Sequence, residues 1–254
     1  MNFKSKWIAS PEQLENRQHL ADLLKNTPIP DLELLQNLGL YINSPSLSRM
    51  FFMNDIYEKI LDVHGVVMEF GVRWGHNLAL FSNFRSIYEP YNFNRKIIGF
   101  DTFEGFPSVN EKDQNQNSAN DFLASTGDFN VTSNYECYLD EILRYHEQEN
   151  PLPHIKKYQI IKGDAVVELE KWLFENPETI IALAYFDLDL YEPTKGCLEL
   201  IKSYLTKGSI IGLDELNHHH FPGETLAFKE VFGLDRFSIR RSRYSRINSY
   251  VLIE

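Results

Sequence analysis

In GVVMEFGVRWGHN, residues 65–77, an apolar run leads through a glycine-containing turn into a helical segment. Strand, turn and helix in this order are typical of βαβ units, which build parallel sheets. The rhythm recurs along the chain after residue 65. It predicts an α/β fold with strands at 65–72, 96–103, 158–164, 181–190 and 209–216.

The two ends of the chain differ from this rhythm. Residues 236–254 hold two alternating segments joined by a polar turn, which predicts an antiparallel β-hairpin that closes the sheet. Residues 1–60 are mainly helical and are expected to form an extension to one domain at 61–254. Residues 107–134 are rich in Asn, Ser, Gln and Asp, and such a long insertion is expected to close over a cleft as a lid.

Composition excludes several partners. The 254 residues carry a formal net charge of −11, and no block of basic residues offsets it, so neither nucleic acid nor an anionic membrane is an expected partner. The first residues lack the apolar region of a secretory signal, and no apolar run is long enough to span a bilayer. These features predict a cytoplasmic protein. Cys137 and Cys197 are far apart and are expected to be free thiols.

Every predicted parallel strand ends in acidic residues. Ligands of open α/β sheets bind beyond the carboxyl ends of the strands, so this repetition predicts one polar cleft. The alternative for any single residue is that it caps the helix that follows. The acids in question are Glu69, Asp101, Asp164, Asp187 with Asp189, and Asp214 with Glu215.

The turn after the first predicted strand suggests a cofactor. Only Gly71 and Gly75 are present, with Arg73 and Trp74 between them, which differs from the glycine triplet that a dinucleotide pyrophosphate requires. Asp101 ends the next strand 30 residues after Gly71, where a ribose-binding carboxylate is expected. An adenosine cofactor without a diphosphate satisfies both features, and S-adenosylmethionine is such a cofactor.

The motifs GVVMEFGVRWGHN, GFDTFEGFP, GDFNVT, KGDA, FDLDLYEPTK and GLDEL resemble, in this order, those of class I S-adenosylmethionine-dependent methyltransferases. More narrowly, the chain resembles the macrocin O-methyltransferase family, which methylates sugar hydroxyls of natural products. The resemblance implies a Rossmann-like fold, with a mostly parallel seven-stranded sheet and helices on both faces. It also implies that Glu69, Gly71 and Gly75 bind the methionine half of the cofactor, Asp101 the ribose and Asp164 the adenine.

The acids of the last two parallel strands predict the catalytic centre. Asp187 and Asp189 would point to one face of a continuing strand, and Asp214 with Glu215 would lie about 5 Å away on the next strand. Such a cluster requires a cation or bound protons, and hard oxygen ligands favour Mg²⁺, Ca²⁺ or Mn²⁺, with Mg²⁺ expected here. The resemblance implies Asp187, Asp214 and Glu215 as metal ligands and Asp187 and Asp189 as catalytic residues. Asp189 and Glu215 have the alternative of facing solvent or capping a helix.

The expected function is therefore O-methylation of a hydroxyl on a sugar or related small molecule. Two alternatives remain open: a metal-dependent hydrolase or oxygenase, and a methyltransferase-like binding module without turnover. His218, His219 and His220 follow the last acidic pair. Any one of them is a candidate for contact with the substrate or the metal, and the alternative is that they form an exposed polar loop. Formation of a homo-oligomer is a further alternative that the sequence leaves open.

Overall fold

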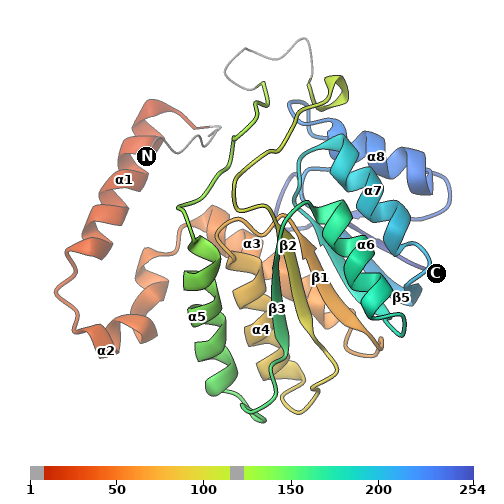
Figure 1. The fold of residues 1–254 in the computed structure, drawn as a ribbon. Helices are drawn as coiled ribbons and strands as arrows, with labels where there is room; N and C mark the ends of the chain where they lie inside the picture. Colours follow the sequence, from red (N-terminus) through yellow and green to blue (C-terminus); the bar gives the residue numbers. More distant parts are fainter. Residues whose placement is uncertain (1–8, 115–122) are drawn as a thin grey trace.

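The computed structural model describes residues 9–114 and 123–254, which form one seven-stranded sheet in the order β3-β2-β1-β4-β5-β7-β6 (Figure 1). The first five strands are parallel, and β7 pairs antiparallel with both β5 and β6. The predicted fold class, including the C-terminal hairpin, is confirmed. The strands are β1 Val66–Phe70, β2 Ile97–Asp101, β3 Tyr158–Lys162, β4 Ile181–Phe186, β5 Leu205–Leu213, β6 Ile239–Arg241 and β7 Ser249–Leu252.

All five parallel strands end two to four residues before the predicted position, and the largest difference is in β4. β4 ends at Phe186, so Asp187 and Asp189 lie beyond it instead of on a continuing strand. Asp189 has a φ of 62°, in the left-handed region that extended strands exclude. The expectation that strand alternation places both side chains on one face was therefore wrong. The loop conformation, and not the pleat, positions these two acids.

Helices cover both faces of the sheet, and two apolar clusters fill the layers between (Figure 1). One cluster joins the sheet to α6, α7 and α8, and the other joins it to α3, α4 and α5. The run of buried side chains along β1 and β4 follows from this double coverage. The helices after β1 are α4 His76–Tyr88, α5 Tyr135–Gln148, α6 Ala165–Glu175, α7 Tyr191–Ile201 and α8 Gly223–Phe232.

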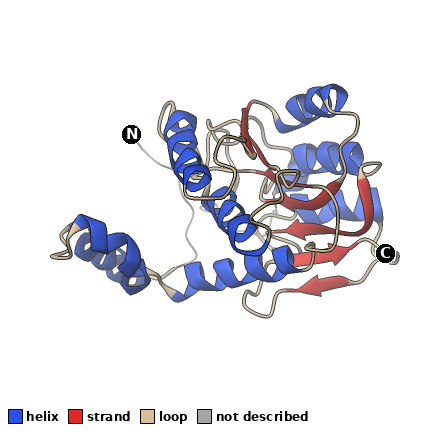
Figure 2. Cartoon of the chain, turned by 90° about the horizontal axis from the view of Figure 1, so that it is seen from below, coloured by secondary structure: helices blue, strands red, loops and turns tan. Residues whose placement is uncertain are grey.

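The N-terminal segment is helical, as predicted, and comprises α1 Pro11–Lys25, α2 Asp31–Leu34, η1 Leu35–Tyr41 and α3 Ser44–Glu58. Ser10 and Gln13 form a capping box that begins α1, and Pro11 occupies its first turn. No residue of α1 is buried, and Figure 2 shows α1 and α2 standing clear of the sheet. In contrast, α3 buries Phe52 and Ile56 within the core. The domain boundary at residue 60 stays a prediction.

The described flanks of the 107–134 insertion lie near the carboxyl edge of the sheet, whereas residues 115–122 fall outside the described chain. Asp113, in the short helix η2 Glu111–Asp113, accepts a hydrogen bond from the backbone N–H of Tyr191. Phe106 and Ala124 form a small apolar cluster with Leu190 and Phe221. These contacts hold both flanks near α7, while closure of the insertion as a lid stays a prediction.

Cys137 and Cys197 are free, as expected. No helix in the described ranges is long and apolar enough to cross a membrane.

Candidate active site

A cavity of about 370 Å³ opens at the carboxyl ends of the parallel strands. Its walls come from the ends of β1 to β5, from α3 and from the loop that joins β6 to β7. The single polar cleft expected from the acid-tipped strands is thus present. Of the predicted site residues, the cavity is lined by Gly71, Asp101, Asp164, Asp187, Asp189, Asp214 and Glu215, whereas Glu69 and Gly75 lie outside its lining.

The end of the cavity near β1 to β3 is lined by two of the predicted cofactor-binding acids, Asp101 and Asp164. Asp101 lines this end and accepts hydrogen bonds from the backbone N–H groups of Arg73, at 2.7 Å, and Phe103, at 2.5 Å. These donors fix the carboxylate in place beside the cavity. Asp164 also lines it, but its Oδ1 accepts from Val166 and Val167 at 3.0 and 3.1 Å and thereby caps α6. The capping alternative therefore holds for Asp164.

The glycines of the turn are required by the protein's own packing. Gly71 has a φ of 90°, and a Cβ added there would lie 2.0 Å from the carbonyl oxygen of Asp187. Gly75 has a φ of 77°, and a Cβ there would lie 2.2 Å from a methyl carbon of Leu139. The sequence suggested close approach of a ligand. In the structure, the groups that lie close to the glycines belong to the protein itself: the Asp187 carbonyl after β4 lies next to Gly71, and Leu139 of α5 lies next to Gly75. Gly71 also borders the cavity.

Glu69 is fully buried beneath the cavity. Its Oε1 accepts a hydrogen bond of 2.7 Å from the side-chain amide of Asn77, and its Oε2 has no hydrogen-bond partner among the described residues. Burial raises the pKa of Glu69 well above its ordinary value, because the low-polarity surroundings disfavour the charged carboxylate. Asn77 also accepts from Arg49, which links Glu69 to the catalytic end of the cavity.

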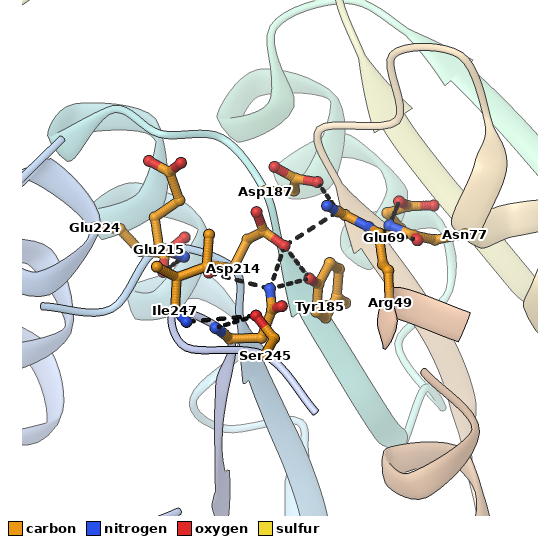
Figure 3. Close-up of polar contacts among 11 residues, drawn as sticks. Arg49, Glu69, Asn77, Tyr185, Asp187, Asp214, Glu215, Glu224, Ser245 and Ile247 are labelled. Atoms are coloured by element: carbon orange, nitrogen blue, oxygen red, sulfur yellow. Dashed lines mark hydrogen bonds and ion pairs between the residues drawn. The ribbon is translucent and has the colours of Figure 1, made fainter. Parts of the chain in front are cut away.

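An arginine from the N-terminal segment reaches into the acidic centre (Figure 3). The Nη2 atom of Arg49, on α3, donates to the carboxylate of Asp187 and lies 3.1 Å from Oδ1 of Asp214. The Arg49 side chain is 30% exposed, and those of Asp187 and Asp214 are 25% and 7% exposed. Burial opposes the charge on Arg49, but the carboxylates, Asp214 foremost, outweigh burial and raise its pKa above the ordinary value.

Asp214 is also held from a second side (Figure 3). The phenol of Tyr185 donates a hydrogen bond to its Oδ1, and the side-chain amide of Asn248 donates to the same atom at 2.6 Å. Asn248 also donates to the backbone carbonyl of Asp214 at 3.1 Å. Since Asn248 lies in the loop between β6 and β7, these bonds tie that loop to the acidic centre.

The acids around Asp214 titrate far from their ordinary range. Burial, reinforced by the charge of Asp214, raises the pKa of Asp187 to about 7. Burial and the charges of Asp187 and Asp214 raise the pKa of Asp189 well above its ordinary value. Burial and the charge of Asp189 raise the pKa of Glu215 to about 11. At neutral pH this cluster of carboxyl groups therefore holds protons. Bound protons were one of the two expected ways to relieve repulsion between the carboxylates, and a bound cation was the other.

The predicted metal ligands do not form a metal site in this arrangement. Asp187, Asp214 and Glu215 line one cavity, but the positive charge between the first two is the guanidinium of Arg49. The protonated Glu215 is a poor ligand for a hard cation. Throughout residues 9–114 and 123–254, no three His, Cys, Asp or Glu side chains are grouped as metal ligands. The present arrangement therefore does not fit the expected ion.

Of the three consecutive histidines, only His218 lines the cavity. Its ring stacks on Phe221 at a centroid distance of 5.8 Å, and its Nδ1 lies 3.7 Å from Oε2 of Glu215. Burial, with the nearby charges of His220 and Arg246, lowers the pKa of His218 below its ordinary value. Burial therefore favours the neutral form of the His218 ring in the wall of the cavity.

Three further residues of this centre carried no recognisable sequence signal. Arg49 lies 138 positions before Asp187, in a helix without a motif, and Asn248 lies within the predicted hairpin. Tyr185 lies two positions before Asp187, within an apolar run that predicts a buried strand residue. Only the fold brings these side chains to the carboxylates.

A mostly parallel sheet with an antiparallel β7, together with a carboxylate at the end of β2 and acids after β4 and β5 around one cavity, is the arrangement of a class I S-adenosylmethionine-dependent methyltransferase. No protein-family model and no curated protein sequence matches the chain significantly. Solved structures do. The crystal structure of CalS11, a calicheamicin methyltransferase, is 42% identical, with coverage of 99% of this chain and 98% of CalS11, at a TM-score of 0.91.

The apo structure of CalS11, described as a TDP-rhamnose 3′-O-methyltransferase in calicheamicin biosynthesis, is 40% identical, with coverage of 97% and 96% and a TM-score of 0.84. The O-methyltransferase NovP is 16% identical over 81% of this chain and 79% of its own, at a TM-score of 0.54, and shows likeness of fold alone. The identity to CalS11 extends over nearly the whole length of both chains. The protein therefore belongs to the S-adenosylmethionine-dependent O-methyltransferase family of CalS11, as the motifs implied.

Proposed function

We propose that the protein methylates a hydroxyl group of a sugar, with the acceptor bound at the acidic end of the cavity. The proposal rests on the similarity to CalS11, which is 42% identical over 99% of this chain. CalS11 is described as a TDP-rhamnose 3′-O-methyltransferase. The carboxylates of Asp187, Asp189 and Asp214 beside one cavity supply the acceptors that a sugar hydroxyl needs.

The cofactor would lie at the other end of the same cavity. Asp101 would accept hydrogen bonds from the ribose hydroxyls, and Gly71 and Asp164, which line the same cavity, would contact the methionine and adenine portions. When bound, S-adenosylmethionine supplies an electrophilic methyl group on its sulfonium sulfur. Glu69 and Gly75 do not line the cavity, so direct contact of these two residues with the cofactor stays a prediction.

In the proposed reaction, the bound cofactor would supply the methyl group to the acceptor oxygen, with its carbon–sulfur bond broken and S-adenosylhomocysteine as the leaving group. The hydroxyl proton passes to a carboxylate of the pair Asp187 and Asp189. A general base is most effective when its pKa lies near the working pH, and that of Asp187, at about 7, meets this condition. Arg49 holds the Asp187 carboxylate in a fixed position as it accepts the proton.

Mg²⁺ at Asp187, Asp214 and Glu215 stays a prediction that depends on Arg49. A divalent cation at these acids would have to displace the guanidinium from Asp187 and Asp214 and release the proton of Glu215. No step of the proposed reaction is therefore assigned to a metal.

Two measurements test the proposed function. First, S-adenosylhomocysteine should raise the melting temperature of the protein, since a ligand that binds only the folded state stabilises it. Second, an assay with S-adenosylmethionine and a nucleotide-activated deoxysugar should yield O-methylated product with the wild type. Asp187→Asn should lower kcat by at least about 100-fold, as loss of a general base does.

Glu170→Gln is the matched control, because Glu170 is an exposed carboxylate on α6 outside the cavity. It should leave kcat unchanged. Binding of S-adenosylhomocysteine without methylation of any sugar acceptor would contradict the proposal and would favour a binding module.

A further inference from the structure

The N-terminal helices α1, α2 and η1 are folded but bury no side chain. We refer to the 33 residues 9–41 as the helical arm, and none of them is buried (Figure 2). The phenol of Tyr41 donates to the hydroxyl of Thr27 at 2.8 Å, which ties the end of the arm to its middle. Helices as short as the 15-residue α1 are marginal in water unless an apolar face packs against another element. The arm therefore requires a surface on which to pack.

The helical arm exposes apolar and acidic side chains. Six of its leucines are between 39% and 89% exposed. Single exposed leucines are ordinary on a protein surface, whereas a group of them on a segment without buried residues marks an interaction surface. The arm also carries five acids against two bases. The exposed leucines are Leu14, Leu23, Leu32, Leu35, Leu38 and Leu40.

A second exposed surface lies where α3 meets the loop between β6 and β7. The ring of Tyr244, in the loop, lies 5.3 Å from that of Phe51 on α3, and the hydroxyl of Ser48 donates to the Tyr244 carbonyl. The guanidinium of Arg243 lies 5.9 Å from the centre of the Tyr244 ring. These contacts join helix and loop into one patch. We refer to it as the rim surface, and its exposed residues are Leu47, Phe51, Arg243, Tyr244 and Arg246.

The rim surface is basic, although the chain as a whole has a net charge of −11. Arg243 and Arg246 are exposed, and neither forms an ion pair with a carboxylate among residues 9–114 and 123–254. Arg85 and Arg95 of the core differ, because they are buried and paired with glutamates. Positive charge beside exposed aromatic rings is complementary to a partner that is acidic and apolar.

Each chain thus carries both members of a complementary pair. The arm is joined to α3 by residues 42 and 43 alone, and it leaves the rim surface of its own chain exposed. Interfaces of ordinary size take about 20–30 residues from each partner, and the arm offers 33 accessible ones. Copies of one chain arranged by symmetry can satisfy every arm and every rim surface at once.

We propose that the helical arm of one copy packs on the rim surface of a second copy. The leucines of the arm would cover Leu47, Phe51 and Tyr244, and its acids would face Arg243 and Arg246. Because Arg246 also lines the cavity, the arm of the neighbouring copy would lie beside the cavity entrance. The exchange can close as a two-fold dimer or as a ring, since arm and rim are different surfaces.

The first test measures the mass of the full-length protein by size-exclusion chromatography with light scattering. The wild type should have a multiple of the 29.7 kDa chain mass. Leu32→Asp with Leu35→Asp, at side chains 89% and 65% exposed, should raise the dissociation constant at least about tenfold, as loss of central interface contacts does. Phe174→Asp with Val167→Asp is the matched control, because these α6 side chains are 86% and 60% exposed and lie outside both surfaces. The control should keep the wild-type mass.

The second test reverses the charges. Glu15→Lys with Glu33→Lys makes the arm basic, and Arg243→Glu with Arg246→Glu makes the rim surface acidic. Each variant alone should be mostly monomeric, because arm and rim then carry the same sign of charge. A mixture of the two should assemble, since each arm finds a rim surface of opposite charge on the other variant. Thermal unfolding checks that every variant has a folded domain.

Three results would overturn the inference. A wild type with the mass of one chain at every protein concentration would exclude exchange of the arm. An unchanged mass for the double leucine variant, or an equal loss in the α6 control, would show that the arm does not form the interface. Failure of the mixed variants to assemble would refute the rim surface as the partner of the arm. None of these measurements involves methyl transfer, so their outcome is independent of the proposed function.

Discussion

Replacement of Arg49 by Gln isolates the role of the arginine that lies between Asp187 and Asp214. The variant keeps a polar side chain but leaves two nearby carboxylates without their cation. Breaking a buried ion pair costs about 3–5 kcal/mol, whereas a fully exposed pair contributes about 0.2–1 kcal/mol. The Arg49 and Asp187 side chains are 30% and 25% exposed, so we expect a loss of about 2 kcal/mol at pH values where Asp187 is ionised.

The loss should depend on pH with a definite sign. Asp187 has a folded-state pKa of about 7, above its unfolded value, so its contribution to stability is full at low pH and declines as pH rises toward 7. Without Arg49 the folded pKa rises further, and the decline extends to higher pH. Each additional unit adds about 1.4 kcal/mol to the difference between variant and wild type above both values. At about pH 6 the carboxyl is mostly protonated in both proteins, and the difference should shrink to about 1 kcal/mol or less.

The assay is urea unfolding of wild type, Arg49→Gln and Arg49→Lys at about pH 6 and about pH 8.5, with a chelator present to remove divalent cations. Arg49→Lys keeps the charge and should lose less stability, with a weaker pH dependence. An Arg49→Gln loss of equal size at both pH values would show that packing, and not charge, is the role of this side chain. No loss at the higher pH would refute the ion-pair argument altogether.

Three further outcomes follow from the same geometry. The value of kcat/KM for methyl transfer should rise with pH through about 7, because the base form of Asp187 accumulates as its proton is lost; a flat profile between about pH 6 and 8 would exclude Asp187 as the base. If a cation and Arg49 compete for the same carboxylates, calorimetric titration with Mn²⁺ should show tighter binding to Arg49→Gln than to wild type. Equal affinities would show that Mn²⁺ does not bind at the carboxylates that Arg49 contacts. Gly71→Ala should lower stability by about 1–3 kcal/mol or prevent folding, because a Cβ would lie 2.0 Å from the Asp187 carbonyl oxygen at a φ of 90°, and an unchanged melting temperature would refute that clash.

Local patterns in the chain were sufficient to predict the sheet but not the geometry of its acidic edge. Apolar runs that end in acids identify the strands, because burial on both faces demands continuous hydrophobicity and the strand ends face the cleft. The same patterns placed Asp187 and Asp189 on a strand that in fact ends at Phe186. Beyond the strand, Asp189 adopts a left-handed conformation with a φ of 62°, which non-glycine residues seldom adopt and which the alternation of residue types does not predict.

Residue patterns were sufficient to predict the order of strands and helices along the chain, the convergence of acids on one cleft and the methyltransferase class. These are short-range properties, read from periodicity and from motifs within single segments. The groups that contact the acids could not be predicted in this way, because the Arg49 cation comes from α3, and the hydrogen-bond donors Tyr185 and Asn248 come from β4 and from the loop after β6. The charge state of a buried carboxylate depends on every group within a few ångströms, and folding alone determines which distant residues those are.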